Sequence, residues 1–254
     1  MPHSSVQKSY KNRVLASLPD AAIELLSPHL FPVNLPLNLT LREPSQAANF
    51  AYFLEEGICS IVTTMESGMS VEVGMIGRDG FVGIPVILGA GHSPNRAFMQ
   101  IAGHGFRVKA QTLTELCDAS ASLRLCLLRS VYSMLVQTAQ ASACNRVHDL
   151  PERLARWLLA CRDRIQTDQI PVTQELLAIL LGTRRSSVTV AAGTLQKAGL
   201  ITYRRGHVVI RDHAGLQDAA CECYKIVRDE SVRLGLLEPG SAEFPPLPAP
   251  GAAA

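Results

Sequence analysis

Basic side chains gather in one stretch of this sequence, between Thr173 and Asp212. That stretch has a net charge of +4, whereas the whole 254-residue chain carries only +2, so the remaining residues sum to −2. Clustered Lys and Arg side chains neutralise phosphate groups, which predicts a surface that binds nucleic acid. A solvated pair of amphipathic helices is the alternative interpretation. The basic residues are Arg184, Arg185, Lys197, Arg204, Arg205 and Arg211.

The elements that must position these charges are a helix–turn–helix. Thr173 is a suitable N-cap, because its hydroxyl oxygen can accept a hydrogen bond from an unpaired backbone N–H. Apolar residues at helical spacing predict a first helix over 174–181 and a second over 184–196. Gly182 between them supplies the left-handed turn that two crossing helices require.

A β-hairpin is predicted directly after the second helix. Residues 200–203 and 208–210 are rich in β-branched and aromatic side chains, and residues 204–207 form the tip between them. Arg204 and Arg205 therefore stand at the tip of a wing, where they can reach a phosphate backbone.

With these motifs, residues 173–212 resemble the winged-helix domain of the Crp/Fnr superfamily of bacterial transcription regulators. The resemblance extends over about residues 12–236 and implies an α+β fold. It implies a jelly-roll-like β-roll sensory domain at 12–111, a dimerisation helix at 112–148 and a winged helix–turn–helix domain at 149–237. We expect a cytoplasmic homodimer that binds double-stranded DNA at an inverted repeat, with RNA polymerase and an unidentified small-molecule effector as candidate further partners.

The resemblance also implies which residues contact DNA. Arg185 and Ser186 occupy the positions that read bases, with Thr189 one helical turn further on. Arginine can bond guanine with two hydrogen bonds, and Ser186 replaces a Glu that is common in the family, so the operator should differ from the usual one. The full predicted set is Thr173, Gln174, Arg184, Arg185, Ser186, Ser187, Thr189, Arg204 and Arg205.

The region from Val33 to Lys109 consists of short apolar runs broken by Gly, Pro and Asn. Such closely spaced runs predict a jelly-roll or barrel, with a hairpin turn at residues 66–68. The predicted strands cover residues 50–54, 58–65, 69–76, 97–102 and 106–109. Two short helices, at 13–18 and 21–26, are expected before them.

One segment of this region lies where cyclic-nucleotide-binding members of the family hold their ligand. In those members a Glu holds the ribose and an Arg-Ser pair holds the cyclic phosphate; here these positions are Phe81 and Arg96-Ala97. Phe81 cannot accept a hydrogen bond from a ribose hydroxyl, and Ala97 offers the phosphate no donor. We therefore expect a signal other than cyclic AMP. The alternative is a cyclic-nucleotide-responsive regulator with a non-standard pocket at Gly80, Phe81, Val82, Gly83, Arg96 and Ala97.

Residues 112–148 contain neither Gly nor Pro and predict one long helix. Apolar and small residues recur along it at three- and four-residue steps, which predicts a seam between two copies of the chain. Burial of the same seam against the β-roll is the alternative. The predicted interface residues are Leu123, Leu127, Val131, Met134, Leu135, Thr138 and Ala141.

The seven cysteines lie mostly in apolar segments, as reduced core thiols do. No Cys precedes Cys59, which excludes the N-terminal iron–sulfur cluster of oxygen-sensing relatives. Two pairs, Cys144 with His148 and Cys221 with Cys223, could each supply two metal ligands, but neither has a third at recognisable spacing. We therefore expect packed thiols, no metal and no cofactor.

Two further expectations follow from motifs and segments that the sequence lacks, and a third concerns its C-terminal residues. No G-x-S-x-G, H-E-x-x-H or P-loop is present, so an enzyme with a β-roll active site is a remote alternative. Each apolar run is interrupted by polar residues, and the N-terminus has no signal-peptide core, so no membrane partner is expected. A final helix is predicted over 213–237, and the Pro- and Ala-rich tail at 238–254 is expected to be disordered.

Overall fold

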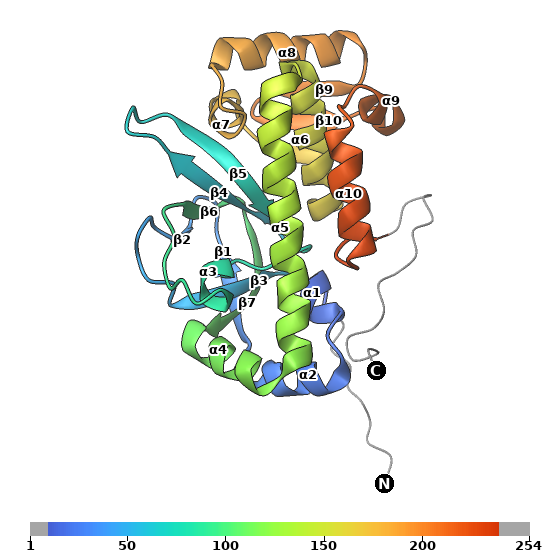
Figure 1. The fold of residues 1–254 in the computed structure, drawn as a ribbon. Helices are drawn as coiled ribbons and strands as arrows, with labels where there is room; N and C mark the ends of the chain where they lie inside the picture. The colour runs from blue at the N-terminus through green and yellow to red at the C-terminus, as the bar shows by residue number, and fades with distance from the viewer. Residues whose placement is uncertain (1–9, 239–254) are drawn as a thin grey trace.

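The computed structural model describes residues 10–238, so the predicted tail lies almost wholly outside the described residues (Figure 1). The N-terminal half is a β-roll made of two antiparallel sheets, with strand orders β1-β7-β3 and β2-β6-β4-β5. The strands are β1 (Phe31–Leu35), β2 (Thr40–Arg42), β3 (Phe50–Leu54), β4 (Ile58–Thr64), β5 (Ser70–Ile76), β6 (Arg96–Ile101) and β7 (Gly103–Lys109).

All five predicted strands of the β-roll are present, and so is the turn at residues 66–68. The strands β1 and β2 were not predicted. The three residues of β2 are too few to show an alternating pattern, and β1 contains Pro32, which argues against a strand in the sequence. Apolar side chains such as Phe53, Leu54 and Met99 fill the space between the sheets and are completely buried.

Helices close the ends and one side of the β-roll. They are α1 (Arg13–Ala16), α2 (Asp20–Leu26), a 3₁₀ turn (Ser27–His29), α3 (Ile84–Ile87), α4 (Ala110–Ala119) and α5 (Ala121–Val147). Figure 1 shows α5 running along the side of the β-roll and on to the C-terminal region at the other end of the molecule.

The prediction of one helix over 112–148 is wrong, because the chain bends by 119° between α4 and α5. Ser120 adopts an extended backbone (φ −133°, ψ 103°), and its Oγ accepts a hydrogen bond from the backbone N–H of Leu123 at 3.3 Å. This is an N-cap in the middle of a sequence with no Gly or Pro, and the serine hydroxyl replaces the helical bond that the bend removes.

Several residues of the predicted dimer seam are buried within the chain itself. Leu123, Leu127 and Val131 are buried in this chain's own core, at 0, 0 and 6% exposure. Further along α5, the sulfur of Met134 lies close to Gly74, and Thr138 Oγ1 donates a hydrogen bond to the Val73 carbonyl at 3.0 Å. These residues contact the β-roll, as the alternative interpretation held. Of the predicted seam, Leu135 is exposed, and Ala141 lines a pocket beside α6.

A second apolar stripe lies on the opposite side of α5 and is exposed. Its members are spaced by three and four residues: Leu125, Leu128, Tyr132 and Leu135, with exposed fractions of 42, 38, 47 and 61%. A helix that packs on its own sheet and also offers a surface to another molecule needs two such stripes, and periodicity alone does not reveal which one faces inward.

The C-terminal region is helical, with one small sheet of order β8-β10-β9. Its elements are α6 (Leu150–Ile165), β8 (Gln169–Pro171), α7 (Gln174–Leu180), α8 (Arg185–Lys197), β9 (Ile201–Arg204), β10 (His207–Ile210), α9 (His213–Asp218) and α10 (Cys223–Arg233). The start of α6 is fixed by a capping box, in which the side-chain carboxylates of Asp149 and Glu152 each accept a hydrogen bond from the other residue's backbone N–H, and Pro151 lies in the first turn.

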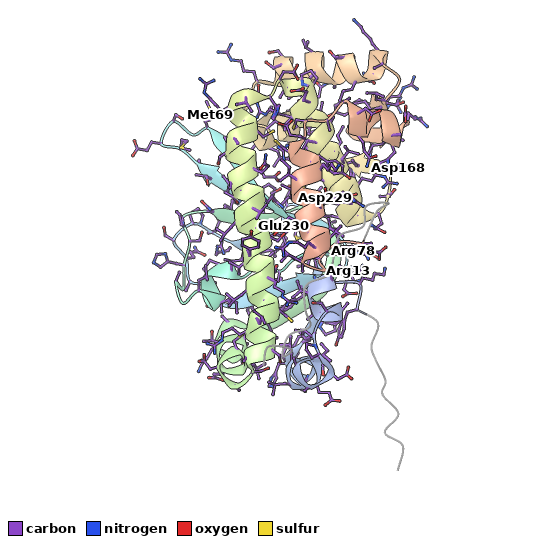
Figure 2. The ribbon with its side chains drawn as sticks, turned by 45° about the vertical axis from the view of Figure 1, so that its right-hand side comes forward. Arg13, Met69, Arg78, Asp168, Asp229 and Glu230 are labelled. Carbon is purple, nitrogen blue, oxygen red and sulfur yellow. The ribbon has the colours of Figure 1, made fainter. Side chains whose placement is uncertain are left out.

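The predicted final helix over 213–237 is two helices, α9 and α10, separated by residues 219–222. Residues two apart on a helix point to opposite sides, yet Cys221 and Cys223 are both buried against Cys144 of α5. The interruption of the helix allows both thiols to face the same way. Figures 1 and 2 both show α10 lying alongside α5.

Candidate nucleic-acid interface

The α7–α8 pair has the geometry predicted for a helix–turn–helix. Thr173 Oγ1 accepts a hydrogen bond from Leu176 N at 3.2 Å and caps α7, and Val188 is fully buried between the helices. Gly182 has a φ of +60°, and a Cβ there would lie 3.0 Å from Cγ2 of Val71 on β5. Glycine is therefore required twice, for the turn and for the approach of the β4–β5 hairpin.

One side of α8 faces away from the protein. Figure 1 shows the helix lying across the end of the molecule, and Arg185, Ser186 and Thr189 are exposed on it as the base-reading assignment requires. Val190 is 71% exposed on the same face and was not predicted from the sequence. An apolar side chain in the middle of a polar exposed face is the signal that could have identified it, since such groups contact the thymine methyl.

Polar contacts join the starts of the two helices. Arg185 Nη1 lies 2.9 Å from Glu175 Oε1, and Thr189 Oγ1 donates a hydrogen bond to Gln174 Oε1 at 3.1 Å. Both pairs are solvent-exposed, so they orient the side chains without locking them. They line an open hollow of about 300 Å³ that extends to Arg205 on the wing.

The wing is a hairpin with a two-residue turn. Arg204 pairs with His207, and the two central residues have positive φ, +47° at Arg205 and +77° at Gly206. This pattern is typical of a type I′ turn, whose twist matches that of the strands. Both arginines are exposed at the tip, and β8, which was not predicted as a strand, adds a third strand on the other side of β10.

The structure fills the predicted nucleotide position with core side chains. Phe81 is 1% exposed and stacks on Phe53 at a centroid distance of 5.7 Å, and Ala97 is fully buried. Arg96 is engaged elsewhere, donating to Thr40 Oγ1 at 2.7 Å and lying 3.7 Å from Glu43.

A cavity of about 180 Å³ does exist between the β-roll and α5. Val82 and Gly83 line it, as do Ser93 and Asn95, whereas Gly80 lines a separate small cavity. The cavity also contains Arg42, which is 9% exposed and whose Nε has no hydrogen-bond partner among residues 10–238. This arginine was not predicted from the sequence, because β2 was not recognised.

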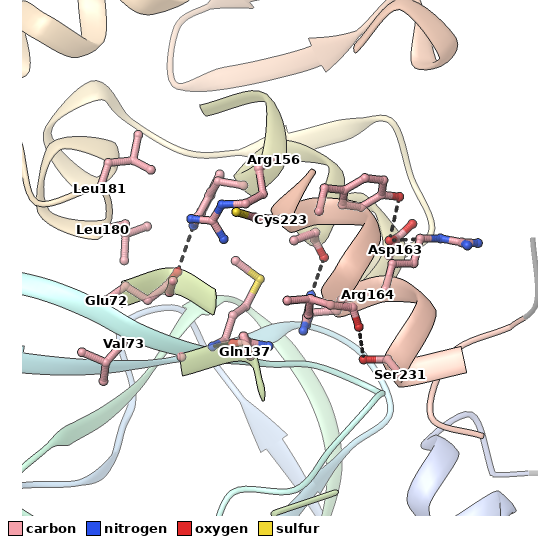
Figure 3. A pocket seen from close by; sticks show the side chains of 18 of the residues that line it. Glu72, Val73, Gln137, Arg156, Asp163, Arg164, Leu180, Leu181, Cys223 and Ser231 are labelled. Atoms are coloured by element: carbon pink, nitrogen blue, oxygen red, sulfur yellow. Dashed lines mark hydrogen bonds and ion pairs between the residues drawn. The ribbon is translucent and has the colours of Figure 1, made fainter. Parts of the chain in front are cut away.

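The C-terminal region is fastened to the β-roll by buried polar contacts (Figure 3). Trp157 Nε1 on α6 donates to Glu72 Oε1 on β5 at 2.9 Å, and Arg164 lies 2.7 Å from Asp79 with both side chains buried. Burial raises the pKa of Glu72 to about 7, against the hydrogen bonds from Ser60 and Trp157 that lower it.

The two pairs of potential metal ligands come together in the structure. The pairs Cys144/His148 and Cys221/Cys223, which are far apart in the sequence, form one cluster in which all four ligand atoms lie within 4.8 Å of one another.

Among residues 10–238, no single helix has the length and hydrophobicity of a membrane span; only α4 and α5 together reach it, across their bend.

Residues 152–219 match the family model of the Crp-like helix-turn-helix domain. The chain is 22% identical over 184 residues to the global nitrogen regulator of Nostoc sp. (strain PCC 7120), which covers 68% of this chain and 82% of that protein. The fold of the present chain is similar to that of the c-di-GMP-responsive global regulator CLP of Xanthomonas campestris. The TM-score is 0.63, with 18% identity over 76% of this chain and 100% of that chain.

A transcriptional regulator of the CRP/FNR family from Thermus thermophilus has the same fold, with a TM-score of 0.62 and 18% identity over 75% of this chain and 98% of that chain. These likenesses span the β-roll, the long helix and the winged helix together, in the order predicted from the sequence. Residues 152–219 are thus a Crp-like helix-turn-helix domain, and the chain as a whole has the fold of the Crp/Fnr regulators.

Proposed function

We propose that this regulator acts as a homodimer that places one α8 helix in each of two successive major grooves of an inverted-repeat operator. The observation that carries the proposal is the exposed face of α8, which lies at the end of the molecule beside the basic tip of the wing. A two-fold dimer requires half-sites about 10 base pairs apart, one helical turn of DNA.

The second copy would pack on the exposed stripe of α5. Leu125, Leu128, Tyr132 and Leu135 alternate steps of three and four residues, which is the 3.5-residue period of a coiled-coil seam. A self-complementary interface of this kind satisfies two-fold symmetry, because each residue of the stripe meets the same stripe of the partner.

The exposed residues of α8 and its neighbours are proposed to fall into two groups: some contact DNA bases, and the others bind the DNA phosphate backbone. Arg185 is proposed to bond a guanine, and Val190 to contact a thymine methyl, with Ser186 and Thr189 beside them. The remaining predicted residues would hold phosphates and set the register of the protein on DNA. These are Thr173, Gln174, Arg184, Ser187, Arg204 and Arg205.

The β-roll cavity is the proposed site of the signal. Arg42 brings an incompletely paired positive charge to a cavity that is lined by apolar side chains such as Ile61, Val73 and Ile76 and by the polar residues Ser93 and Asn95. An acidic small molecule other than cyclic AMP is the effector class that suits this lining. A cytoplasmic location with RNA polymerase as a further partner completes the proposal, and catalysis has no part in it.

In vitro selection from a random DNA duplex pool tests the proposal directly. We expect enrichment of an inverted repeat, bound by two chains, with half-sites one helical turn apart. Full-length protein that enriches no sequence would contradict sequence-specific binding, while enrichment of a single, unrepeated half-site would contradict the dimer and leave DNA reading intact.

A further inference from the structure

Four potential metal ligands converge where α5 ends and α10 begins. Cys144 and His148 are one turn apart at the end of α5, and Cys221 and Cys223 flank the start of α10. The three cysteines are 0 to 5% exposed and form a small core cluster of their own, and the side chain of His148 is 14% exposed.

Two distances within the cluster are close to those of a tetrahedral site, and all four ligand atoms lie within 4.8 Å of one another. The sulfurs of Cys144 and Cys221 are 3.5 Å apart, and Cys223 Sγ is 3.5 Å from His148 Nδ1. Zinc–sulfur bonds of ~2.3 Å and zinc–nitrogen bonds of ~2.0 Å in a tetrahedron place neighbouring ligand atoms about 3.5–3.8 Å apart. A disulfide would instead require about 2.05 Å between sulfurs.

The histidine is oriented as a metal ligand. Its Nδ1 faces the sulfurs, while Nε2 lies 3.1 Å from Glu222 Oε2. A carboxylate that accepts from the far ring nitrogen fixes the tautomer and leaves the near nitrogen free to bind a cation, an arrangement that metal-bound histidines almost always show. The side chain of Glu222 is 69% exposed, so burial does not force the carboxylate into this position.

Charge around the cluster is also suitable. Three thiolates and one divalent cation leave a net charge of −1, because binding releases the three thiol protons. Arg153 and Arg156 of α6 act electrostatically on Cys144, and their positive charges offset that excess. Gln140 adds a hydrogen bond from Nε2 to Cys223 Sγ at 3.2 Å.

We propose that Cys144, His148, Cys221 and Cys223 bind one thiolate-preferring divalent metal ion, with zinc as the first candidate. The soft sulfur-rich donor set disfavours calcium and magnesium, which take oxygen ligands. The ion would tie α10 to the end of α5, at the junction where Asp149 begins α6. The proposal is independent of DNA binding, since it concerns only these four side chains.

Metal titration of the reduced, chelator-treated full-length protein tests it. We expect one equivalent of zinc or cobalt per chain, intense visible absorption typical of tetrahedral thiolate-bound cobalt, and a higher unfolding temperature when the metal is bound. Cys144→Ser and His148→Ala should each lose stoichiometric binding. Cys117→Ser, which removes a buried thiol from a different core, should retain it.

A variant of a surface residue tests the proposal even if the cysteine variants fold poorly. Glu222→Gln should fold normally and bind the metal about 10- to 100-fold more weakly. Asp218→Asn removes an exposed carboxylate four positions before Glu222; it is the control and should bind as wild type does. Absence of a stoichiometric site in reduced wild type, full retention in Cys144→Ser, or a Cys144–Cys221 disulfide that forms in place of metal binding would each overturn the proposal.

Discussion

At the scale of single residues, the proposed base-reading residue Arg185 makes one exposed ion pair. In the free protein its guanidinium pairs with Glu175 at 2.9 Å, yet 66% of the side chain remains exposed. An exposed pair of this kind contributes about 0–1 kcal/mol, so the arginine can leave it for a base with little cost.

Arg185→Ala should therefore reduce affinity for the selected operator by about 1–3 kcal/mol and affect random DNA much less, because the lost bonds are to a base. Binding isotherms on the operator and on a scrambled duplex provide the comparison. Lys197→Ala, near the end of the same helix, is a matched loss of charge. Equal losses on both DNAs for Arg185→Ala would mean that this residue holds the backbone.

Arg205 places a positive charge at the wing tip, but its backbone has a left-handed conformation that other residues adopt more readily. Its φ of +47° is tolerated more readily by Asn, so Arg205→Asn removes the charge while favouring the type I′ turn. Affinity for specific and random DNA should fall by a similar factor, and the slope of log affinity against log salt should decrease by about one. A change confined to the operator would show that the wing reads sequence.

At the scale of elements, α5 presents one apolar stripe to its own β-roll and another to solvent. Replacing Leu128 and Leu135 by Asp should dissociate the proposed dimer, since four carboxylates would be buried at the seam. Leu127→Ala should have the opposite profile, a loss of about 2–5 kcal/mol in the free energy of unfolding with the dimer retained. Sedimentation velocity and urea unfolding measure the two effects. A double Asp variant that remains dimeric would place the interface elsewhere.

The contact between β5 and α6 should respond to pH. Burial raises the pKa of Glu72 from 4.5 to about 7, so the folded protein favours the protonated carboxyl. The contribution of this group to the free energy of unfolding is therefore complete below pH 4.5 and is lost as the pH rises through 7. Glu72→Gln removes that dependence, so its free energy of unfolding relative to wild type should increase from pH 5 to pH 8, by on the order of 1–3 kcal/mol.

Urea unfolding followed by the fluorescence of Trp157, the single tryptophan, is a suitable measurement because this side chain donates to Glu72. Glu66→Gln, at the exposed tip of the same hairpin, controls for the loss of a carboxylate from β4–β5. A difference that stays constant from pH 5 to pH 8 would show that Glu72 does not titrate in this range.

At the scale of the whole molecule, the β-roll reaches the helix–turn–helix through the β4–β5 hairpin. Figure 2 shows Met69 at the hairpin tip, and the hairpin tip and the α7–α8 turn line a common groove. The close approach of Val71 to Gly182 provides a direct contact between the β-roll, which is the proposed signal-receiving part, and the helix–turn–helix. A change in the β-roll can therefore act on the turn without passing through α5.

Cyclic AMP should neither bind the full-length protein nor alter its affinity for the selected operator. Phe81 is part of the core, and Ala97 offers no donor to a phosphate. Calorimetry should give no saturable heat, and operator isotherms with and without the nucleotide should coincide. Saturable binding that involves Arg42 would instead support the alternative of a non-standard nucleotide pocket.

What the sequence determined by itself was local. The cap at Thr173, the turn at Gly182 and the Arg-Arg-Gly-His tip each depend on residues a few positions apart, so the helix–turn–helix and wing could be predicted almost residue by residue. The turns and strands of the β-roll followed for the same reason, apart from β1 and β2.

Only the tertiary structure decided the features that depend on distant partners. Which stripe of α5 faces inward was set by the β-roll packed against it, and periodicity is the same for either stripe. The sulfurs of Cys144 and Cys221 meet although 77 positions separate them, because α10 folds back along α5. Each cysteine pair offered two ligands in the sequence, and the fold brought four together.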